Sequence, residues 1–196
     1  MRFASLGSGS AGNALVVEAG RTRLLLDCGF GLNEAINRLA RLGLRPRDLT
    51  GIVITHEHTD HIGGAGRFAR KYTLPVWLTA GTLSMAQDME GTEVHVIDSH
   101  EQFALGDLLV QPFPVPHDAR EPVQFVFGDG AKRLGVLTDV GCSTAHIESM
   151  LAGVEALVLE CNHDRTMLAE GAYPPGLKRR VGGRFGHLEN SQSAEL

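Results

Sequence analysis

A stretch of six residues gathers side chains of the types that bind metals in proteins. It reads His56-Glu57-His58-Thr59-Asp60-His61 and contains three of the nine histidines in the sequence. The apolar run 52–55 precedes it directly, and the pair Gly63-Gly64 follows shortly after. Imidazole is the commonest metal ligand, and carboxylates complete many sites for divalent cations. A solvated loop or a helix cap does not require so many convergent ligands, so the segment predicts a metal site at the end of a buried strand.

The spacing of these side chains favours two adjacent ions over one. Alternate residues of an extended chain point to the same side, which groups His56 with His58. Asp60 and His61, at the far end of the loop, can reach a second position. We therefore expect two divalent metal ions, zinc or manganese.

Two ions need more ligands than one loop supplies, and two later residues occupy suitable places. His117 and Asp139 each come directly after an expected strand, where the loop begins. A carboxylate at Asp139 could bridge both ions, which typically lie about 3.5–4 Å apart in such sites. Taken alone, His117 is equally well interpreted as a surface histidine and Asp139 as a turn residue, but the ligand-rich loop upstream favours the metal interpretation.

The expected reaction is hydrolysis by a metal-bound hydroxide. A divalent metal lowers the pKa of its water from 15.7 to about 7, so no serine or cysteine nucleophile is needed. Asp60 could accept a proton from the attacking water. Glu57 does not fit a zinc protease, because the neighbouring histidines are two residues apart and not four.

Substrate contacts are expected in two places. The glycine and serine loop 7–10 has backbone amides that can approach a phosphate, so Ser8 and Ser10, with Asn13 behind them, are candidate substrate-binding residues, although such a loop is more often only a tight turn. The basic residues of the segment 178–184 could contact a nucleic-acid backbone, although a solvated face explains them equally well. The whole chain has a net charge of -5, so any contact with nucleic acid must be local.

Composition predicts one domain, covering residues 1–196, in a reducing compartment. The chain is 43% hydrophobic, which is enough for one sizeable core. Cys28, Cys142 and Cys161 are widely separated, which argues against a disulfide framework and against a thiolate zinc site. No apolar run has the length of a signal peptide or a membrane span, so we expect a cytoplasmic protein without membrane contact.

The expected elements begin as alternating strands and helices and end as strand after strand. Asp27 ends one of the first strands beside the metal loop, and we expect it to support a ligand rather than to bind metal itself. Glycine- and proline-rich sequence beyond Met167 predicts a surface loop. The expected strands cover 14–17, 23–26, 52–55, 76–78, 94–97, 108–110, 113–115, 123–127, 133–138 and 156–159, and the expected helices cover 32–42, 62–72, 83–89 and 143–151, the last capped by Ser143.

These residues resemble the metallo-β-lactamase superfamily, whose signature is HxHxDH followed by a distant His and an Asp. Within it, the sequence is similar to the YycJ (WalJ) group of DNA exonucleases, which is related to ribonuclease Z and to the phosphodiesterase PhnP. The resemblance implies a mixed α/β fold, an αββα four-layer sandwich, and a nucleic-acid substrate, with DNA as the expected one. The segments that carry the resemblance are 6–13, 26–29, 56–61, 117–122 and 160–164.

Position by position, the resemblance implies roles for the candidate residues. Glu160 and His163 are similar to residues that support the site or position substrate. Gly186-His187-Leu188 resembles a segment that carries a catalytic histidine in ribonuclease Z, so His187 is a candidate proton donor; the alternative is an exposed histidine in a polar tail. The ligand set that the resemblance implies is His56, His58 and His117 for one metal, Asp60 and His61 for the second, and Asp139 as the bridge.

The resemblance also raises an expectation about the C-terminal part. Family members continue to an Ala-His-Leu-Ser segment whose histidine completes the second metal site, and this sequence stops at Leu196 without one. We therefore expect the C-terminal part of the fold to be truncated and the second metal to bind weakly, because a water that fills the gap adds no charge. Tight binding there would mean that His163, His187 or a partner chain replaces the missing ligand.

Three functions remain open on the sequence alone. The first is a nuclease or phosphodiesterase, favoured by the resemblance and by the basic segment. The second is a small-molecule hydrolase of the same fold, acting on a cyclic phosphodiester, a lactone or a thioester, favoured by the acidic net charge. The third is an inactive metal-binding protein, suggested by the missing histidine.

Overall fold

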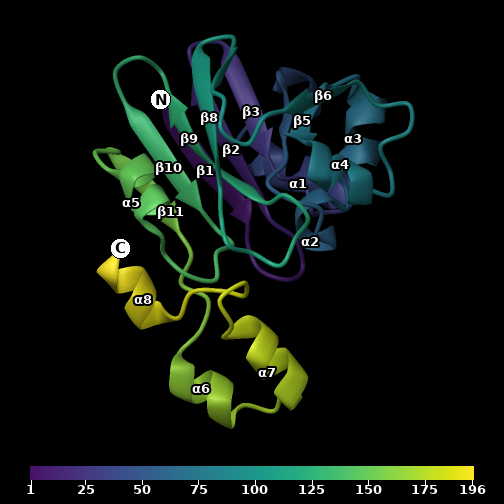
Figure 1. The fold of residues 1–196 in the computed structure, drawn as a ribbon. Helices are drawn as coiled ribbons and strands as arrows, with labels where there is room; N and C mark the ends of the chain where they lie inside the picture. The colour runs from purple at the N-terminus through teal and green to yellow at the C-terminus, as the bar shows by residue number, and fades with distance from the viewer.

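Two β-sheets form the centre of the molecule (Figure 1). The structure is a computed structural model that describes residues 1–196. The first sheet has six strands in the order β1-β2-β3-β4-β5-β6. Strands β1 to β3 pair antiparallel, and β3 to β6 pair parallel. Their bounds are β1 Arg2–Gly7, β2 Ala14–Ala19, β3 Thr22–Leu26, β4 Gly51–Val53, β5 Val76–Thr79 and β6 Val94–Ile97.

The second sheet has five strands in the order β11-β10-β9-β8-β7. Its pairs are antiparallel except for β10 and β11, which run parallel with Leu137 opposite Leu159. The chain enters it only after leaving the first sheet, as the change from alternating elements to consecutive strands predicts. Its strands are β7 Phe103–Leu105, β8 Leu108–Pro114, β9 Val123–Gly128, β10 Arg133–Leu137 and β11 Ala156–Leu159.

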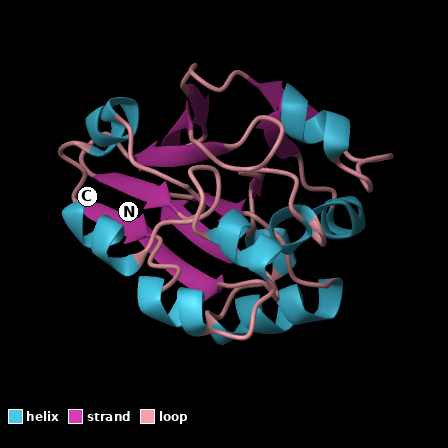
Figure 2. Cartoon of the chain, turned by 60° about the horizontal axis from the view of Figure 1, so that its bottom comes forward, coloured by secondary structure: helices cyan, strands magenta, loops and turns pink.

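Helices cover the outer faces of both sheets, which gives the four-layer αββα sandwich expected from the sequence (Figure 2). Apolar residues of the first sheet, among them Leu25, Ile52 and Val76, pack with Leu39 and Phe68 from the helices outside it. The helices outside the first sheet, with one short 3-10 helix, are α1 Leu32–Arg41, η1 Pro46–Asp48, α2 Thr59–Ile62, α3 Ala65–Tyr72 and α4 Ala80–Met85, and α5 Ala145–Leu151 covers the second sheet.

Apolar side chains from both sheets form the core between them. Val17 and Leu24 from the first sheet meet Phe125, Phe127 and Val136 from the second, and all five are fully buried. A further cluster, including Phe113 and Ile147, joins the second sheet to α5. None of the helices has both the length and the apolar composition that a membrane-spanning helix requires.

Loops that carry the candidate ligands leave the sheets at one edge. Asp27 follows β3 and His56 follows β4, two parallel strands of the first sheet. Asp139 follows β10 and Glu160 follows β11, two parallel strands of the second. Because the carboxyl ends of parallel strands lie at the same edge, this arrangement gathers side chains that are far apart in the sequence.

Several sequence-based boundaries were wrong, and most of the differences have local causes. Strand β1 was not expected. The helix expected at 62–72 is two helices, because the Gly64 amide donates to the Cys28 carbonyl oxygen at 2.8 Å and not to a carbonyl of the same helix. The helix expected at 83–89 spans Ala80–Met85, since the Thr79 side chain accepts a hydrogen bond from the Thr82 amide and so starts the helix earlier. The two strands expected at 108–110 and 113–115 form the single strand β8.

The C-terminal segment differs most from expectation. Helix α5 is capped by Thr144, whose side chain accepts from the Ile147 amide, and not by Ser143. Beyond Met167, where a loop was expected, the chain forms further helices and leaves the body of the sandwich (Figure 1). They are α6 Arg165–Glu170, α7 Pro175–Val181 and α8 Asn190–Glu195.

Candidate metal centre

Three imidazole nitrogens converge on one point below the sheets. His56 Nε2 lies 2.9 Å from His58 Nδ1, and His117 Nε2 lies 3.3 Å from the same His58 nitrogen. Two zinc–nitrogen bonds of about 2.05 Å at the tetrahedral angle place their nitrogens about 3.3 Å apart. The spacing of the three nitrogens therefore fits a shared metal ion.

In each of the three rings, the nitrogen that points away from this point makes a hydrogen bond, and that bond fixes which nitrogen faces inward. His58 Nε2 donates to the Asp118 carbonyl oxygen at 3.1 Å, and His117 Nδ1 donates to the Gly186 carbonyl oxygen at 3.0 Å. His56 Nδ1 lies 2.9 Å from the Thr55 hydroxyl, whose own proton goes to Asp27. Each ring thus places its N–H on an oxygen and turns a lone pair inward. Three lone pairs that face one another offer a site for a cation.

Burial keeps two of these rings neutral. His56 and His117 are buried, and burial lowers the pKa of His56 well below its ordinary value and that of His117 to about 4. The neighbouring histidines oppose a positive charge on either ring further. A neutral imidazole is the form that ligates a metal, so His56 and His117 need no deprotonation at neutral pH.

A second group of ligand-type atoms adjoins the first through His61. His61 Nε2 lies 3.2 Å from Asp139 Oδ2 and 3.5 Å from Asp60 Oδ2. One nitrogen of His56, one of His61 and one Asp139 oxygen all lie within 4.8 Å of one another. Asn13 Nδ2 contacts both Asp60 Oδ2 at 3.1 Å and His61 Nε2 at 3.0 Å. The geometry offers a second ion position beside the first, with Asp139 at its edge.

The charges of this second group differ from those of the triad. Burial disfavours a charge on His61, but Asp27, Asp139 and Asp60 outweigh it and raise the pKa of His61 to about 9. Burial raises the pKa of Asp139 to about 7, although His61 opposes the shift. Without a metal, this group therefore holds protons that a second cation would displace.

His187 and Glu160 form a third group that touches the second. His187 Nδ1 lies 2.5 Å from Glu160 Oε1 and 3.5 Å from Asp139 Oδ1. Glu160 Oε2 accepts from the amides of Val140 and Leu188 at 3.2 and 3.1 Å, which fixes the carboxylate. Burial opposes protonation of His187, but the hydrogen bond and charge of Glu160 raise the pKa of His187. His187 is therefore held beside Asp139, with Glu160 favouring its protonated form.

The loop that carries the ligands is fixed by the strands next to it. The Asn13 amide donates to the Asp60 carbonyl oxygen, and the Cys28 amide to that of His61, both at 2.7 Å. At Gly29 the two segments touch so closely that a Cβ would lie 1.8 Å from the Asp60 carbonyl oxygen. Glycine is the only residue that permits this approach, which sets the position of the loop.

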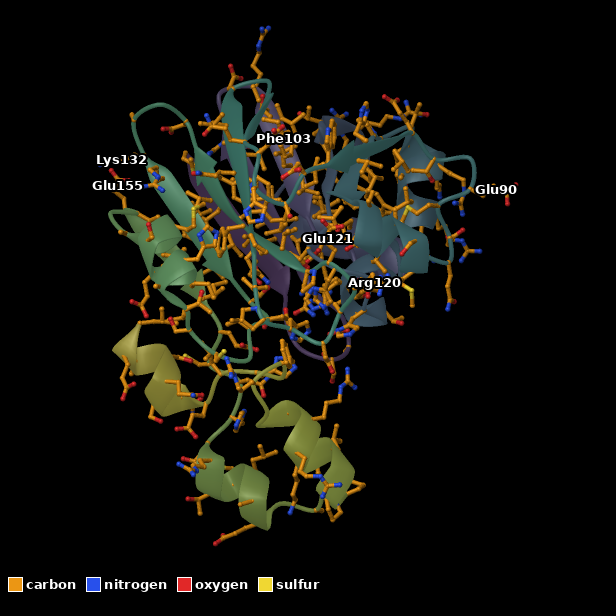
Figure 3. All side chains as sticks on the ribbon, in the orientation of Figure 1. Glu90, Phe103, Arg120, Glu121, Lys132 and Glu155 are labelled. Atoms are coloured by element: carbon orange, nitrogen blue, oxygen red, sulfur yellow. The ribbon has the colours of Figure 1, made fainter.

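The loop after β8 is anchored as firmly. The Arg120 amide donates to Glu57 Oε1, and Glu121 Oε2 accepts from the Gly81 amide, both at 2.7 Å. Figure 3 shows Arg120 and Glu121 beside α4, on the side of the first sheet. The second sheet thus reaches across to the first at this loop, which carries His117.

Two cavities meet at the centre and share Asp60, Asp139 and His187. The smaller, about 350 Å³, is lined by these residues and by His58, Asp118, Leu177 and Arg180, among others. The larger, about 520 Å³, is lined by them and by Ser8, Ser10, Asn13, Cys161 and Asn162, among others. Another cavity, about 540 Å³, lies between the β7–β8 and β9–β10 turns and holds none of the ligand-type clusters.

The structure brings most of the sequence-based candidates together and leaves one apart. Five of the six expected ligands belong to groups whose ligand atoms lie within 4.8 Å of one another, and the sixth, Asp60, adjoins them through His61. Asp27, Glu160 and His187 contact these groups. Ser8, Ser10 and Asn13 line the larger cavity. His163 does not line it: its backbone pairs with Glu189, and its ring contacts the Asn162 side chain.

Two residues of the site were not expected from the sequence. The Thr55 hydroxyl donates to Asp27 and contacts His56 and His61. Asp118 Oδ1 lies 3.5 Å from His117 Nε2, while Asp118 Oδ2 accepts from Arg180. Both adjoin a candidate ligand in the sequence, and that adjacency is the only signal that could have found them.

Comparison with known proteins places these features in a family. A family model described as "Beta-lactamase superfamily domain" matches residues 22–196. The exodeoxyribonuclease YycJ of Bacillus anthracis is 36% identical over 200 residues, covering 99% of this chain and 75% of that protein. The exodeoxyribonuclease WalJ of Streptococcus pneumoniae is 32% identical, covering 99% and 74%. A diphosphatase from the PhnP family superimposes with a TM-score of 0.74 at 19% identity, covering 98% of this chain and 79% of the other.

Proposed function

The chain belongs to the metallo-β-lactamase superfamily, and from that premise we propose that it is a metal-dependent hydrolase that cleaves phosphodiester bonds in nucleic acid. The observation that carries this proposal is the convergence of three imidazole nitrogens beside a carboxylate, at the meeting point of two cavities. A Lewis-acidic centre of this kind, open to a polymer on two sides, suits hydrolysis of a phosphodiester.

Each metal position is assigned to residues of this chain. His56, His58 and His117 would hold one ion, and His61, Asp60 and Asp139 a second, with Asp139 between them. Zinc or manganese would supply a hydroxide at neutral pH and neutralise charge on the phosphate. Both sheets contribute ligands, so we treat residues 1–196 as a single domain.

Two residues would handle the protons. Asp60 is only partly buried and lines both cavities, which suits it to accept a proton from the attacking water. His187 also lines both cavities, and its Nδ1 is engaged by Glu160, so its Nε2 is free to protonate the leaving oxygen. The raised pKa of His187 keeps that proton available at neutral pH.

The two cavities would hold the substrate on either side of the cleaved bond. The larger offers the hydroxyls of Ser8 and Ser10 and the amides of Asn13 and Asn162 to a nucleotide. The smaller offers the guanidinium of Arg180 to the phosphate backbone. Because two relatives that match 99% of this chain are named exodeoxyribonucleases, we propose DNA as the substrate.

The state of the three cysteines supports a proposal for the cellular compartment of the protein. Cys28, Cys142 and Cys161 are all free thiols, as suits a reducing environment. We propose that the protein acts in the cytoplasm.

End-labelled oligonucleotides test the proposed function. Protein loaded with manganese or zinc is incubated with single-stranded DNA, duplex DNA and RNA, alongside a cyclic dinucleotide and a lactone. We expect DNA to be shortened, and His58→Ala and Asp60→Ala to remove nearly all of that activity at unchanged thermal unfolding temperature. The matched control is His100→Ala, an exposed histidine away from the centre. Hydrolysis of the small molecules alone, or full activity of Asp60→Ala at equal metal content, would refute the proposal.

A further inference from the structure

A helical arm projects from the sandwich next to the metal centre. It comprises residues 164–186, includes α6 and α7, and lies below the two sheets, away from the core (Figures 1 and 3). No residue of α6 or α7 is buried. The arm is therefore mostly surface, and the fold of the sandwich does not account for its composition.

The arm is positive on a negative molecule. It contains five basic residues (Arg165, Lys178, Arg179, Arg180 and Arg184) and two acidic ones (Asp164 and Glu170), a net +3, whereas the whole chain carries -5. Lys178 donates to the Ala169 carbonyl oxygen, and Arg180 pairs with Asp118. The other three guanidinium groups are exposed and have no ion pair or hydrogen bond within the chain.

The same arm exposes large apolar side chains to an unusual extent. Phe185 is 61% exposed, Tyr173 58% and Met167 74%. Phe185 stands two residues before His187, and Tyr173 lies in the turn between α6 and α7. The arm thus carries two exposed rings and three unpaired guanidinium groups, side chains that suit flat, negatively charged ligands.

We propose that the helical arm is a binding surface, or platform, for single-stranded nucleic acid. The arm positions the end of the bound strand at the metal centre. Bases stack on the rings of Phe185 and Tyr173, and backbone phosphates pair with Arg179 and Arg184. Stacking of this kind needs unpaired bases, because a duplex hides their faces. The inference rests on the proposed nuclease function and deepens it by naming the single strand as the form that is bound.

The arm leads directly into the centre. Leu177, Arg180 and Val181 of α7 line the smaller cavity together with His58 and Asp60. A strand lying on the arm therefore enters beside Arg180 and places its end across Asp139 and His187. The end nucleotide then occupies the larger cavity, which has no lysine or arginine in its lining.

Binding without cleavage tests the aromatic half of the proposal. Fluorescein-labelled oligothymidylate is titrated with protein in EDTA, and fluorescence anisotropy gives the dissociation constant. Phe185→Leu should weaken binding about 5- to 150-fold, as expected for the loss of one stacked base, and Phe185→Trp should restore it. The matched control is Phe3→Leu, which removes an exposed ring from β1, and it should leave affinity unchanged.

Salt dependence tests the charged half. Arg179→Gln and Arg184→Gln should each lower the slope of log affinity against log salt by about 0.7, the value for one phosphate contact on a single strand. Arg47→Gln is the matched control, because Arg47 is exposed and precedes β4, at the opposite end of that strand from His56. A duplex of the same length should bind the wild-type chain more weakly than the single strand.

The outcomes separate this inference from the proposed function. If the wild-type chain shortens DNA while Phe185→Leu, Arg179→Gln and Arg184→Gln bind oligothymidylate like the wild type, the arm is not the platform and the nuclease function stands. If the metal-loaded chain leaves all nucleic acids intact, the proposed nuclease function is wrong, and the inference that rests on it is overturned as well. The wild-type chain could instead have the mass of a dimer in solution, while Phe185→Leu has the mass of a monomer. That result would show that the arm binds a second copy of the chain, and it would overturn the inference.

Discussion

His61 Nδ1 lies 2.8 Å from Asp27 Oδ2, and the opposite nitrogen of the same ring faces Asp139. Asp27 in turn accepts from the Thr55 amide and hydroxyl, so both of its oxygens are engaged. Its backbone has φ of 59°, a left-handed conformation that Asp and Asn tolerate better than other side chains. A buried carboxylate is thus held where it orients a candidate ligand and makes it more basic.

Replacing Asp27 by asparagine should weaken metal binding at the His61 position. Asn fits the same backbone and can still accept from His61, but it removes the negative charge that favours a metal on the ring. We expect affinity at this position to fall about 10- to 100-fold, measured by calorimetric titration with zinc or manganese. Asp98→Asn, an exposed carboxylate outside the centre, is the matched control. Equal affinities in Asp27→Asn and wild type would contradict the assigned role.

The two metal positions should differ in affinity and in pH dependence. An ion at His61 must displace a proton from a group whose pKa is about 9, so its affinity should rise about tenfold for each pH unit from 7 toward 9. Below pH 7 the Asp139 carboxyl, with its pKa of about 7, adds a second proton to be displaced. At the three-histidine position, the pKa values of His56 and His117 lie far below this window, so affinity there should change little.

Calorimetric titration of metal-free protein at pH 7, 8 and 9, in buffers of different ionisation enthalpy, measures both affinities and the protons released. One tight site and one weaker, proton-coupled site are expected. Two sites of equal affinity with no proton release at pH 7 would count against this assignment of the ligands.

His187→Gln should slow hydrolysis about 10²- to 10⁴-fold and change its pH profile. A proton donor works only while protonated, so the wild-type rate should fall as the pH rises through the raised pKa of His187. His187→Gln should lose this alkaline limb. Glu160→Gln, which removes the interaction that raises the pKa, should move the limb to lower pH. Initial rates from pH 6 to 9 on end-labelled DNA measure the effect, and an unchanged alkaline limb in His187→Gln would exclude it as the donor.

The three thiols should react with iodoacetamide in a fixed order. Cys28 is fully buried, and burial raises the pKa of its thiol to about 12, so it should stay unmodified at pH 8 in the folded protein. Cys161 is exposed beside the larger cavity and should react first. Peptide mapping over time measures the order, with urea-unfolded protein as the control in which all three react. Early modification of Cys28 would show that the strand it follows opens readily.

The sandwich and its ligand loop could be predicted because their signals are local. Apolar strands such as 52–55 end directly on the ligands, and the order of strands and helices indicates two layers of sheet. Strand β1 gives no such signal: Phe3 is 45% exposed, and the strand is held mainly by pairing with β2. An edge strand with exposed side chains has no apolar pattern from which to predict it.

Helices α6 and α7 were not predicted because, like β1, they lack an apolar pattern. Neither buries a residue, so neither carries an apolar periodicity. Pro174-Pro175 reads as a loop, yet Pro175 occupies the first turn of α7, where its missing N–H costs nothing. Within the site, the roles of Thr55 and Asp118 depend on contacts across the fold, and spacing alone does not reveal such contacts.

The close approach at Gly29 makes a position without any side chain as restrictive as a ligand. A single methyl group there would have to displace the backbone at Asp60, and with it the residues on either side of that peptide. In a saturation library selected for hydrolysis, position 29 should therefore be as intolerant of substitution as His61, although it contributes no atom to the reaction. Mutational intolerance in this protein reports the packing of one loop on another as much as it reports chemistry.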